Sequence, residues 1–489
     1  RSISAAIGIG STAGVAGSAG VYVLDIASQA LIGSPTLGDK GRVSSATGSG
    51  QTLVAEGNVV VQATADLELD VIAGSVSAAG SAAVGAAAAV PVVTKTVESF
   101  IAGGASVTGL GTRAISDVVN GEFSVSFVDP GGKFSINPTS AVSAGSNTVT
   151  FASAHGAETG DALFYDANDG GAIGGLTDQT TYYVITIDGD TIKLASSPNN
   201  ATAGTALVLS LSGTSGTDHE FEVLDGRVRP IPMDGGNQDL DDDGSADVVS
   251  QSLTMWRDTT ATTTPIKGVA VTSGNHDQID VIGAAGGGSG SFALNISGAV
   301  TVLTTNTRSY IAENAQINQS AGTVGADQSV YVNSGNDYGT LSISAALSLS
   351  GSVAITPGAA VLVINHTTEA YIDDDVTVTA AGDVVVTASG RDDVTQIAAG
   401  VAGSGTAAVS GAVSYIDITN LTRAFIGNDA SSVADRVDVT AGGNVVVSAV
   451  DQTKLLFVAG SVAIGIAGGG IGAGVSVTTI DKDTQAYVG

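Results

Sequence analysis

Residues 456–466 read LFVAGSVAIGI, and after the turn AGGG the chain continues as IGAGVSV at residues 471–477. In the first run the large aliphatic side chains fall on even positions, and the odd positions between them are mostly small. Beyond the glycines the large side chains shift to odd positions. Because successive side chains of a strand point to opposite faces, this period of two predicts two long strands joined by a small-residue turn.

This segment is one of six stretches that contain no Asp, Glu, Lys or Arg. They are residues 2–24, 71–94, 281–307, 338–368, 394–416 and 455–480. Each is long enough for a membrane-spanning helix, but the period of two and the frequent glycines disfavour helices. An uncharged strand is typically buried on both sides, so we expect core strands whose bare face lets a second sheet approach.

Two short motifs mark the same repeat. Leu or an aromatic residue followed by Ile or Val occurs at residues 31–32, 100–101, 310–311, 371–372, 425–426 and 487–488. A valine run follows Gly-Asn or Gly-Asp at residues 59–61, 384–386 and 445–447. The spacings indicate about six units of 55–65 residues, with one gap of 210 residues. We therefore expect β-repeat units 1–2 in residues 1–109, an insertion at 110–266 and units 3–6 in residues 267–489.

The segment at residues 437–449 predicts a strand, a Gly/Asn turn and a second strand, since Gly and Asn tolerate positive φ. Stacked units of this kind form a β-solenoid, in which each repeat buries its face on the next. The predicted fold is therefore all-β, a repetitive β-solenoid with an inserted small all-β domain. Stacked long antiparallel β-hairpins are the alternative, because each charge-free stretch also fits two strands around a turn.

The repeats resemble those of giant bacterial secreted and surface adhesins, the filamentous-haemagglutinin-like and repeats-in-toxin-type proteins. The resemblance rests on composition and period over about two thirds of the chain. It implies a stalk or filament at the bacterial cell surface, whose partners are copies of itself, neighbouring repeats, or cell-surface glycans or proteins. The GGxGxD calcium repeat of the toxin family is absent, so the calcium roll of that family is not implied.

Within the insertion, residues 137–224 predict a small β-domain. Its expected strands are 148–151, 162–165, 181–185, 191–194 and 219–223. The segments 154–161 and 175–185 resemble a module common in giant bacterial repeat proteins, for which no catalytic role is implied. His155 lies close to Asp161 in sequence, but no nucleophile pattern accompanies them, so we expect a turn histidine bonded to backbone.

The sharpest chemical signal lies within residues 234–250, in the sequence DLDDDGSAD. Carboxylates at positions 1, 3, 5 and 9 with Gly at position 6 have the spacing of a calcium loop. The predicted Ca²⁺ ligands are Asp239, Asp241, Asp243, Asp247 and the backbone carbonyl of Ser245. Ser250 replaces the Glu of an EF-hand, and the loop resembles those of integrin-type β-propeller blades. We expect Ca²⁺ to stabilise the junction between the insertion and the solenoid.

Charge and composition restrict the function. With 47 acidic and 17 basic residues the net charge is −30, which argues against a nucleic-acid partner. The absence of Cys excludes disulfides and thiol chemistry. The profile suits an extracellular protein, and the start at Arg1 without a leader leads us to expect a longer parent chain. The acidic clusters at 373–375 and 391–393 are expected at strand edges, where charge discourages pairing.

Three functions remain to be compared. A structural and adhesive segment explains the repeats, the acidity and the calcium loop. A membrane-associated or pore-forming β-assembly is the alternative suggested by the uncharged strands, although the scarce aromatics and the small-residue faces argue against membrane insertion. A polysaccharide-acting β-helix enzyme would need basic residues beside an acidic cluster, and the basic residues here are few and scattered, so we expect no enzyme.

Overall fold

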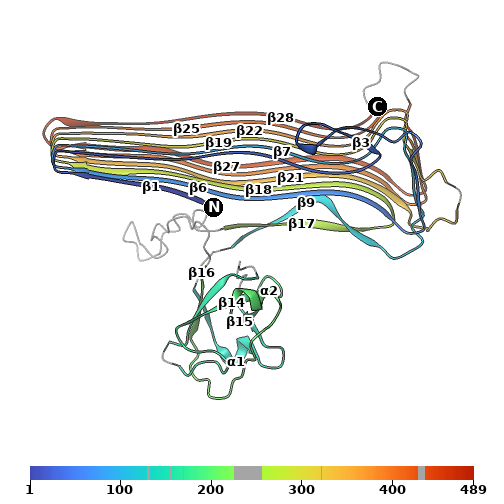
Figure 1. Cartoon of the computed structure of the whole chain (residues 1–489), viewed down its shortest axis with the longest axis horizontal. Coiled ribbons are helices and arrows are strands. Elements are labelled where there is room, and N and C mark those ends of the chain that lie inside the picture. The colour runs from blue at the N-terminus through green and yellow to red at the C-terminus, as the bar shows by residue number, and fades with distance from the viewer. Residues whose placement is uncertain are drawn as a thin grey trace, which may run out of the picture. The chain divides into compact units, whose positions relative to one another are not determined.

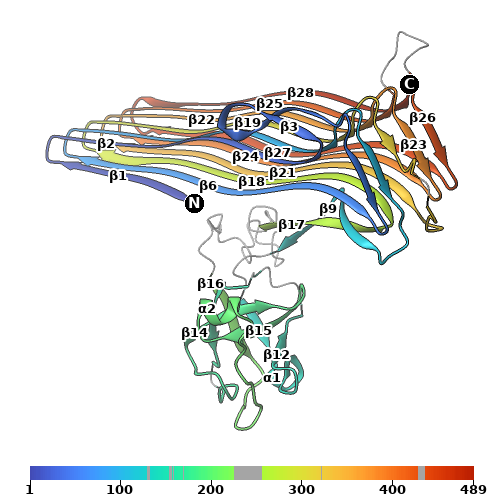
Figure 2. The same ribbon diagram turned by 45° about the vertical axis from the view of Figure 1, so that its right-hand side comes forward.

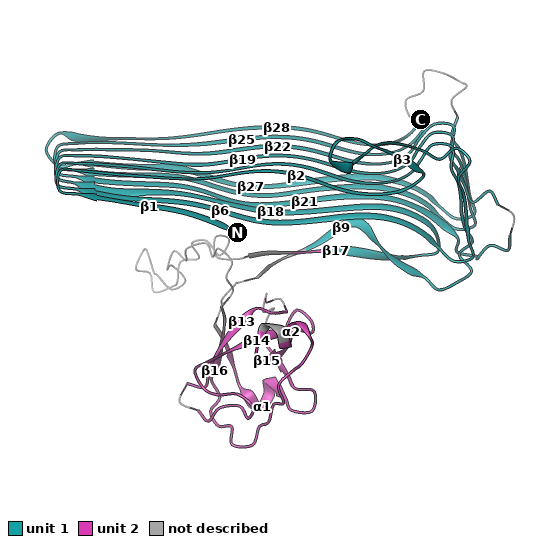
Figure 3. Ribbon diagram, in the orientation of Figure 1, with its two compact units in different colours: residues 1–124, 261–489 teal, residues 125–260 magenta. Residues whose placement is uncertain are grey.

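The computed structural model describes residues 1–128, 133–152, 157, 159–168, 170–224, 256–320, 322–427 and 436–489. Two compact units emerge, one from residues 1–124 with 261–489 and one from residues 125–260 (Figure 3). The larger unit is a stack of long strands (Figure 1), whereas the smaller unit is a separate antiparallel β-domain. Among the described residues, no helix has the length and apolar character that crossing a membrane requires.

Three parallel sheets build the larger unit. Sheet I contains β1 (Ser2–Gly10), β6 (Val59–Ala79), β18 (Gly268–Ser289), β21 (Ser329–Ser350), β24 (Val384–Ser404) and β27 (Val445–Gly465). Sheet II contains β2 (Ala13–Ile32), β7 (Ala82–Ile101), β19 (Phe292–Ile311), β22 (Val353–Ile372), β25 (Ala407–Ile426) and β28 (Gly469–Val488). The short sheet contains β5 (Thr52–Ala55), β8 (Ser106–Gly109), β20 (Gln316–Ile317), β23 (Thr377–Ala380) and β26 (Asp438–Ala441).

Each complete coil runs from the short sheet into sheet I, through a tight turn, and back along sheet II (Figure 2). The two strands of a charge-free segment thus pair with the neighbouring coils in two different sheets and not with each other. This confirms the β-solenoid, and the alternative of stacked antiparallel hairpins is wrong. The physical reason is the small inward face, which lets the two sheets lie against each other while their backbones pair along the stack.

The sequence motifs occupy equivalent positions in every coil. The valine runs begin sheet I strands and lie in register, so that Val269 pairs with both Val59 and Val330. Their inward side chains fill an apolar cluster with the ends of sheet II and with the short sheet. A second apolar cluster lies further along both long sheets and includes Val71, Leu303 and Ile416. The solenoid core is therefore divided into two parts.

The charge-free strands are oriented differently from the expectation. Small residues such as Ala73, Ala83 and Ala89 face inward and have no exposed surface. Near the tight turns the large aliphatic side chains face outward, and Val76 and Leu349 remain 53% exposed even in interior coils. Further from the turns, large side chains such as Leu303 are buried between the sheets. The expectation that these segments are buried on both sides is therefore wrong for the part near the turns, where mostly small side chains lie between the closely spaced sheets.

Two segments extend from the regular coils. In the first coil, sheet II leads into a hairpin formed by β3 (Ser34–Leu37), the 3₁₀ helix η1 (Asp39–Gly41) and β4 (Val43–Thr47). In the second, the chain leaves through β9 (Ser116–Val128), which pairs with the returning β17 (Trp256–Ile266). Gly121 in β9 has a φ of 81°, and a Cβ there would overlap the backbone of Ser334, so β9 lies close against the outer face of sheet I.

The smaller unit is the predicted small all-β domain. Its elements are β10 (Lys133–Ile136), α1 (Pro138–Ala141), β11 (Val142–Ser143), β12 (Thr148–Thr150), β13 (Ala162–Asp166), β14 (Thr180–Thr186), β15 (Thr191–Ala195), α2 (Pro198–Thr202) and β16 (His219–Leu224). They form a seven-stranded sheet in which neighbours are antiparallel. Its core includes Tyr165, Phe221 and Leu194, none of which has exposed surface.

Candidate functional site

The predicted calcium ligands Asp239, Asp241, Asp243, Ser245 and Asp247 lie outside the described residues, as does His155. Asp161 lies immediately before β13, in the smaller unit. Within the parts of the chain that are described, no group of three or more His, Asp or Glu side chains is arranged to hold a metal ion. The calcium loop therefore stays a prediction from its donor spacing.

A column of polar side chains separates the two apolar clusters inside the solenoid. Sheet II contributes Lys95, Thr305, His366, Asn420 and Lys482, which lie in register along the stack. Sheet I contributes Asn275, Asp277, Asn336, Asp392 and Asp451. We call this set the polar column. Because the acids come from one sheet and the basic groups from the other, the column links the two sheets electrostatically.

The deepest pair of the column is Lys95 and Asp277. Their side chains have no exposed surface, and Lys95 Nζ lies 2.5 Å from Asp277 Oδ1. The ammonium also donates to the backbone carbonyl of His276 at 3.3 Å, and Asn275 Nδ2 donates to the other oxygen of Asp277 at 2.7 Å. Each charge thus has further partners, which a buried ion pair needs in order to offset its loss of hydration.

Asp392 forms the centre of the column in the later coils. His366 Nδ1 lies 3.1 Å from its Oδ1, and Asn420 Nδ2 donates to its Oδ2 at 2.5 Å. Burial acts to raise the pKa of Asp392, but the hydrogen bonds from His366 and Asn420 and the nearby positive charges outweigh it and lower the pKa. Asp392 is 1% exposed, so these groups are not accessible to a dissolved substrate.

The polar column shows that the expected position of residues 391–393 is wrong, and its residues follow a sequence pattern that was not recognised. Arg391, Asp392 and Asp393 were expected at a strand edge, but they lie within β24, where Asp392 and Asp393 are buried and Arg391 Nη2 is 2.9 Å from Asp393. In every coil from the second onward, a polar residue stands five positions before the aromatic motif, as Lys95 does before Phe100. This recurring offset could have located the column from the sequence.

Asp280 marks the point where the charged part of sheet I gives way to uncharged strand. It lies in register with Asp70, is 3% exposed, and accepts hydrogen bonds from Leu341 N at 2.9 Å and Gln278 Nε2 at 2.8 Å. Burial raises the pKa of Asp280 to about 7, and the charges of Asp70 and Glu68 add to this effect. This carboxyl group therefore titrates close to neutral pH.

The outer face of sheet II carries two ladders along the stack. The aromatic motif forms a ladder of rings stacked 4.7–5.1 Å apart and within 4° of parallel: Phe100, Tyr310, Tyr371, Phe425 and Tyr487. Because Tyr310, Tyr371 and Phe425 are each stacked between two neighbouring rings, this part of the ladder offers no open platform for stacking a sugar. Beside it, Arg308 pairs with Glu369 at 3.0 Å. Both ladders thus stabilise the stacking of coils.

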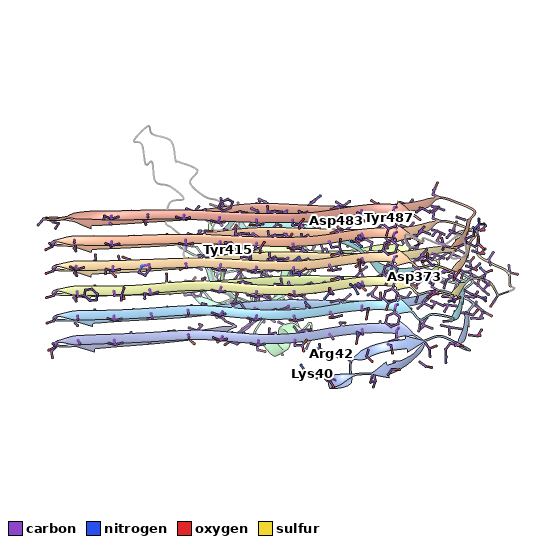
Figure 4. The ribbon with its side chains drawn as sticks, turned by 90° about the horizontal axis from the view of Figure 1, so that it is seen from above. Lys40, Arg42, Asp373, Tyr415, Asp483 and Tyr487 are labelled. Atoms are coloured by element: carbon purple, nitrogen blue, oxygen red, sulfur yellow. The ribbon has the colours of Figure 1, made fainter. Side chains whose placement is uncertain are left out.

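The first-coil hairpin is attached beside these ladders. Lys40 and Arg42, both labelled in Figure 4, belong to this hairpin. They contact Asp25 at 2.6 Å and 2.5 Å, and their hydrogen bonds lower the pKa of its carboxyl group. A hollow of about 320 Å³ separates β4 from Phe100 and Tyr310. It contains one charged side chain, Glu98, which is hydrogen-bonded to the hydroxyl of Tyr310 in the same lining and to Gln29 Nε2.

Another group of polar side chains, separate from the polar column, lies on the outer face of sheet I beneath β9. His276 Nδ1 is 2.8 Å from Asp337 Oδ2, and Arg391 Nε is 4.0 Å from the other oxygen of Asp337. The ring of Phe123 lies 6.4 Å from that of His276. Asp337 has no exposed surface and His276 is 18% exposed, so the group presents only part of His276 to solvent, beside Phe123 of β9.

Among the described residues of the smaller unit, His219 is a buried histidine whose contacts are structural. His219 Nδ1 lies 2.7 Å from the hydroxyl of Tyr165, and its Nε2 lies 2.9 Å from the carbonyl of Ser215. The Tyr165 hydroxyl also accepts from the amide of Ile173 at 2.9 Å. Burial raises the pKa of Tyr165 to about 12. Both ring nitrogens of His219 are thus engaged in holding the domain together.

The remaining candidate is a surface, which we call the blade. It comprises residues 2–22, 71–91, 281–301, 342–362, 396–416 and 457–478, which are in register and include no Asp, Glu, Lys, Arg or His. Figure 1 shows it as the end of the stack where the tight turns lie. Across sheet II it contains a shallow hollow of about 500 Å³, lined by Ala86, Ala88, Gly17 and other small or apolar groups.

Comparison with known proteins gives no further guide, because no family model, curated protein or solved structure matches this chain. The interpretation therefore rests on the geometry described above.

Proposed function

We propose that the chain is a structural and adhesive segment of a large extracellular bacterial repeat protein, which forms a stalk, filament or matrix fibre. The observation that carries the proposal is the stacking of coils in register. Val384 to Ser404 pair without a break with Val445 to Gly465, and β25 pairs with β28 in the same way. Each added coil lengthens the stack by about 4.8 Å, so such a segment acts as a spacer.

The distribution of polar groups supports this role. Among the described residues, Lys95, Asp277, His366 and Asp392 are buried in the polar column, and Arg308 and Glu369 are paired on the surface, so that these groups join coils and sheets. We therefore propose that the segment is not an enzyme. Its partner is a further coil, from the same parent chain or another copy, stacked on the outermost strands β27 and β28. There the apolar interior is exposed, as shown by Ile480, which is 46% exposed although its register partner Ile418 is buried.

An inward charge on the last coil should prevent this stacking. In Ile480→Lys an ammonium would point into the interior that an added coil must cover, and inward charges on edge strands block pairing. We expect the 489-residue chain to form rods that lengthen with protein concentration in electron micrographs, and the variant to stay short. The control is Thr479→Lys, which adds the same charge on the outer face. Equal rod lengths for both variants would contradict stacking at this edge.

Calcium should stabilise the junction between the solenoid and its insertion. The loop at residues 239–247 contains five carboxylates, four of them at the predicted ligand positions, and oxygen donors of this kind suit Ca²⁺. We expect a chelator to lower the melting temperature of the chain and Asp243→Ala to remove this sensitivity. The control is Asp375→Ala, an acidic turn residue elsewhere. A variant that still responded to the chelator as the parent does would place the calcium site outside this loop.

A further inference from the structure

We propose that the blade is a lipid-contacting surface, which enters the hydrocarbon interior of a bilayer with its row of tight turns leading. This inference goes beyond the structural role proposed above, because it assigns a partner to a surface that stacking leaves exposed.

Aliphatic side chains cover both outer faces of the blade. On sheet I, Val76 and Leu349 are each 53% exposed, and on sheet II, Ile296 and Val413 are 43% and 42% exposed. All four belong to interior coils, so the exposure does not come from the ends of the stack. Water-soluble monomers rarely expose continuous apolar areas of this kind, which mark interaction sites when they occur.

The polar groups of the blade are turned inward. Ser297 and Ser344 share a hydrogen bond of 2.7 Å between the two sheets, and neither has more than 2% exposed surface. A Cβ at Gly283 would overlap the carbonyl oxygen of Gly298 in the opposite sheet, so the sheets are as close as their backbones allow. The blade is therefore a thin double layer whose interior consists mostly of Ala, Gly and Ser and whose exterior is aliphatic, so its larger apolar side chains lie outside.

The length of the blade matches a bilayer. In the second coil it extends over residues 71–79 of sheet I and 82–91 of sheet II. At about 3.3 Å per residue these strands span about 30 Å, which is the thickness of a hydrocarbon core. Transmembrane strands have about the same number of residues.

The blade ends at a sharp polar boundary. Sheet II becomes charged at Asp25 and Asp417, and the ladder containing Arg308 and Glu369 follows. Tyr415 lies at this boundary, with its hydroxyl 3.5 Å from Asp417 Oδ2 (Figure 4). A tyrosine between an apolar and a charged zone is typical of a membrane interface.

A bilayer fits this surface better than a second protein does. A copy of the chain packed on one flat face would leave the opposite face exposed, whereas lipid covers both faces and the turns together. The turns carry Ser, Gly, Thr and Ala, as in Ser11-Thr12 and Gly80-Ser81, with no charge to hinder entry. Unpaired backbone N–H and C=O groups at the edge of the stack are unfavourable in lipid, because no water is present to bond them. Stacking of further coils pairs these groups and should therefore strengthen membrane binding. The bound fraction should then increase more than in proportion to the protein concentration.

The first test uses a single reporter cysteine, since the chain has none of its own. Ala86→Cys on the exposed blade and Thr96→Cys further along the same strand would carry an environment-sensitive fluorophore. With neutral phosphatidylcholine vesicles we expect the label at position 86 to shift to the blue and to be quenched by nitroxides deep in the acyl chains, at high salt as well. The label at position 96 should do neither.

The second test uses charge. We expect Val84→Lys to reduce co-flotation with these vesicles at least tenfold and Thr96→Lys to leave it unchanged, with circular dichroism confirming that both fold. A label at position 86 that shifts with protein concentration alone, and is not quenched by the nitroxides, would overturn the proposal in favour of a second copy. Rod formation in electron micrographs without lipid tests the proposed stalk function and does not depend on membrane binding. Failure of the stalk proposal can therefore be distinguished from failure of the lipid proposal.

Discussion

Replacing Lys95 with Met should lower the free energy of unfolding by about 3–5 kcal/mol, because it leaves Asp277 buried and without its positive partner. Both side chains lack exposed surface and their charged atoms lie 2.5 Å apart. Of the remaining contacts of Asp277, Asn275 supplies a hydrogen bond but no charge. The measurement is the urea midpoint of the larger unit, followed by far-ultraviolet circular dichroism.

The double variant Lys95→Met with Asp277→Leu should recover most of this loss, since replacing a whole buried pair by apolar groups is often neutral. Thr96→Met is the matched control, because it places the same side chain on the outer face of the same strand and should change the midpoint little. A double variant as unstable as Lys95→Met alone would show that packing around the methionine, and not the unpaired carboxylate, causes the loss.

The repeat and the strands follow from the sequence because backbone pairing in register forces equivalent residues into columns. The valine runs and the aromatic motif reveal that register directly: Val330 pairs with Val384, and Tyr371 stacks on both Tyr310 and Phe425. Alternation of large and small residues likewise reveals the strand period. The repeat motifs and the strand period are set by residues close together in the sequence, so they can be recognised in a single sequence.

The sequence of a strand does not by itself determine which of its two faces points into the solenoid. A period of two is the same whether Val76 or Ser77 faces the interior, and the distance between the two sheets decides between them. In this fold the sheets lie so close together near the tight turns that the inward positions there are mostly Ser, Ala and Gly, and the aliphatic side chains face outward. The polar column escaped prediction for a related reason, since Lys95 and Asp277 are 182 residues apart and meet only across two sheets.

Asp280 should make the stability of the larger unit fall as pH rises from about 4 to 7. An unfolded aspartate titrates near 4, whereas burial raises the pKa of Asp280 to about 7 in the fold. Between these values the folded chain holds a proton that the unfolded chain has lost, so raising the pH favours unfolding. Over the full range the loss reaches about 4 kcal/mol, since each unit of pKa difference is about 1.4 kcal/mol.

Asp280→Asn should remove this dependence, because the amide oxygen can still accept from Leu341 N and Gln278 Nε2 while no proton is lost. We expect the variant to equal the parent near pH 4.5 and to exceed it in stability at pH 8, as measured by urea midpoints of the larger unit. Asp392 changes stability in the opposite direction, since its lowered pKa gives stability above pH 4 that acid removes. Its contribution is the same in both proteins and cancels in their difference, so a difference that stayed constant between pH 4.5 and 8 would contradict the assignment to Asp280.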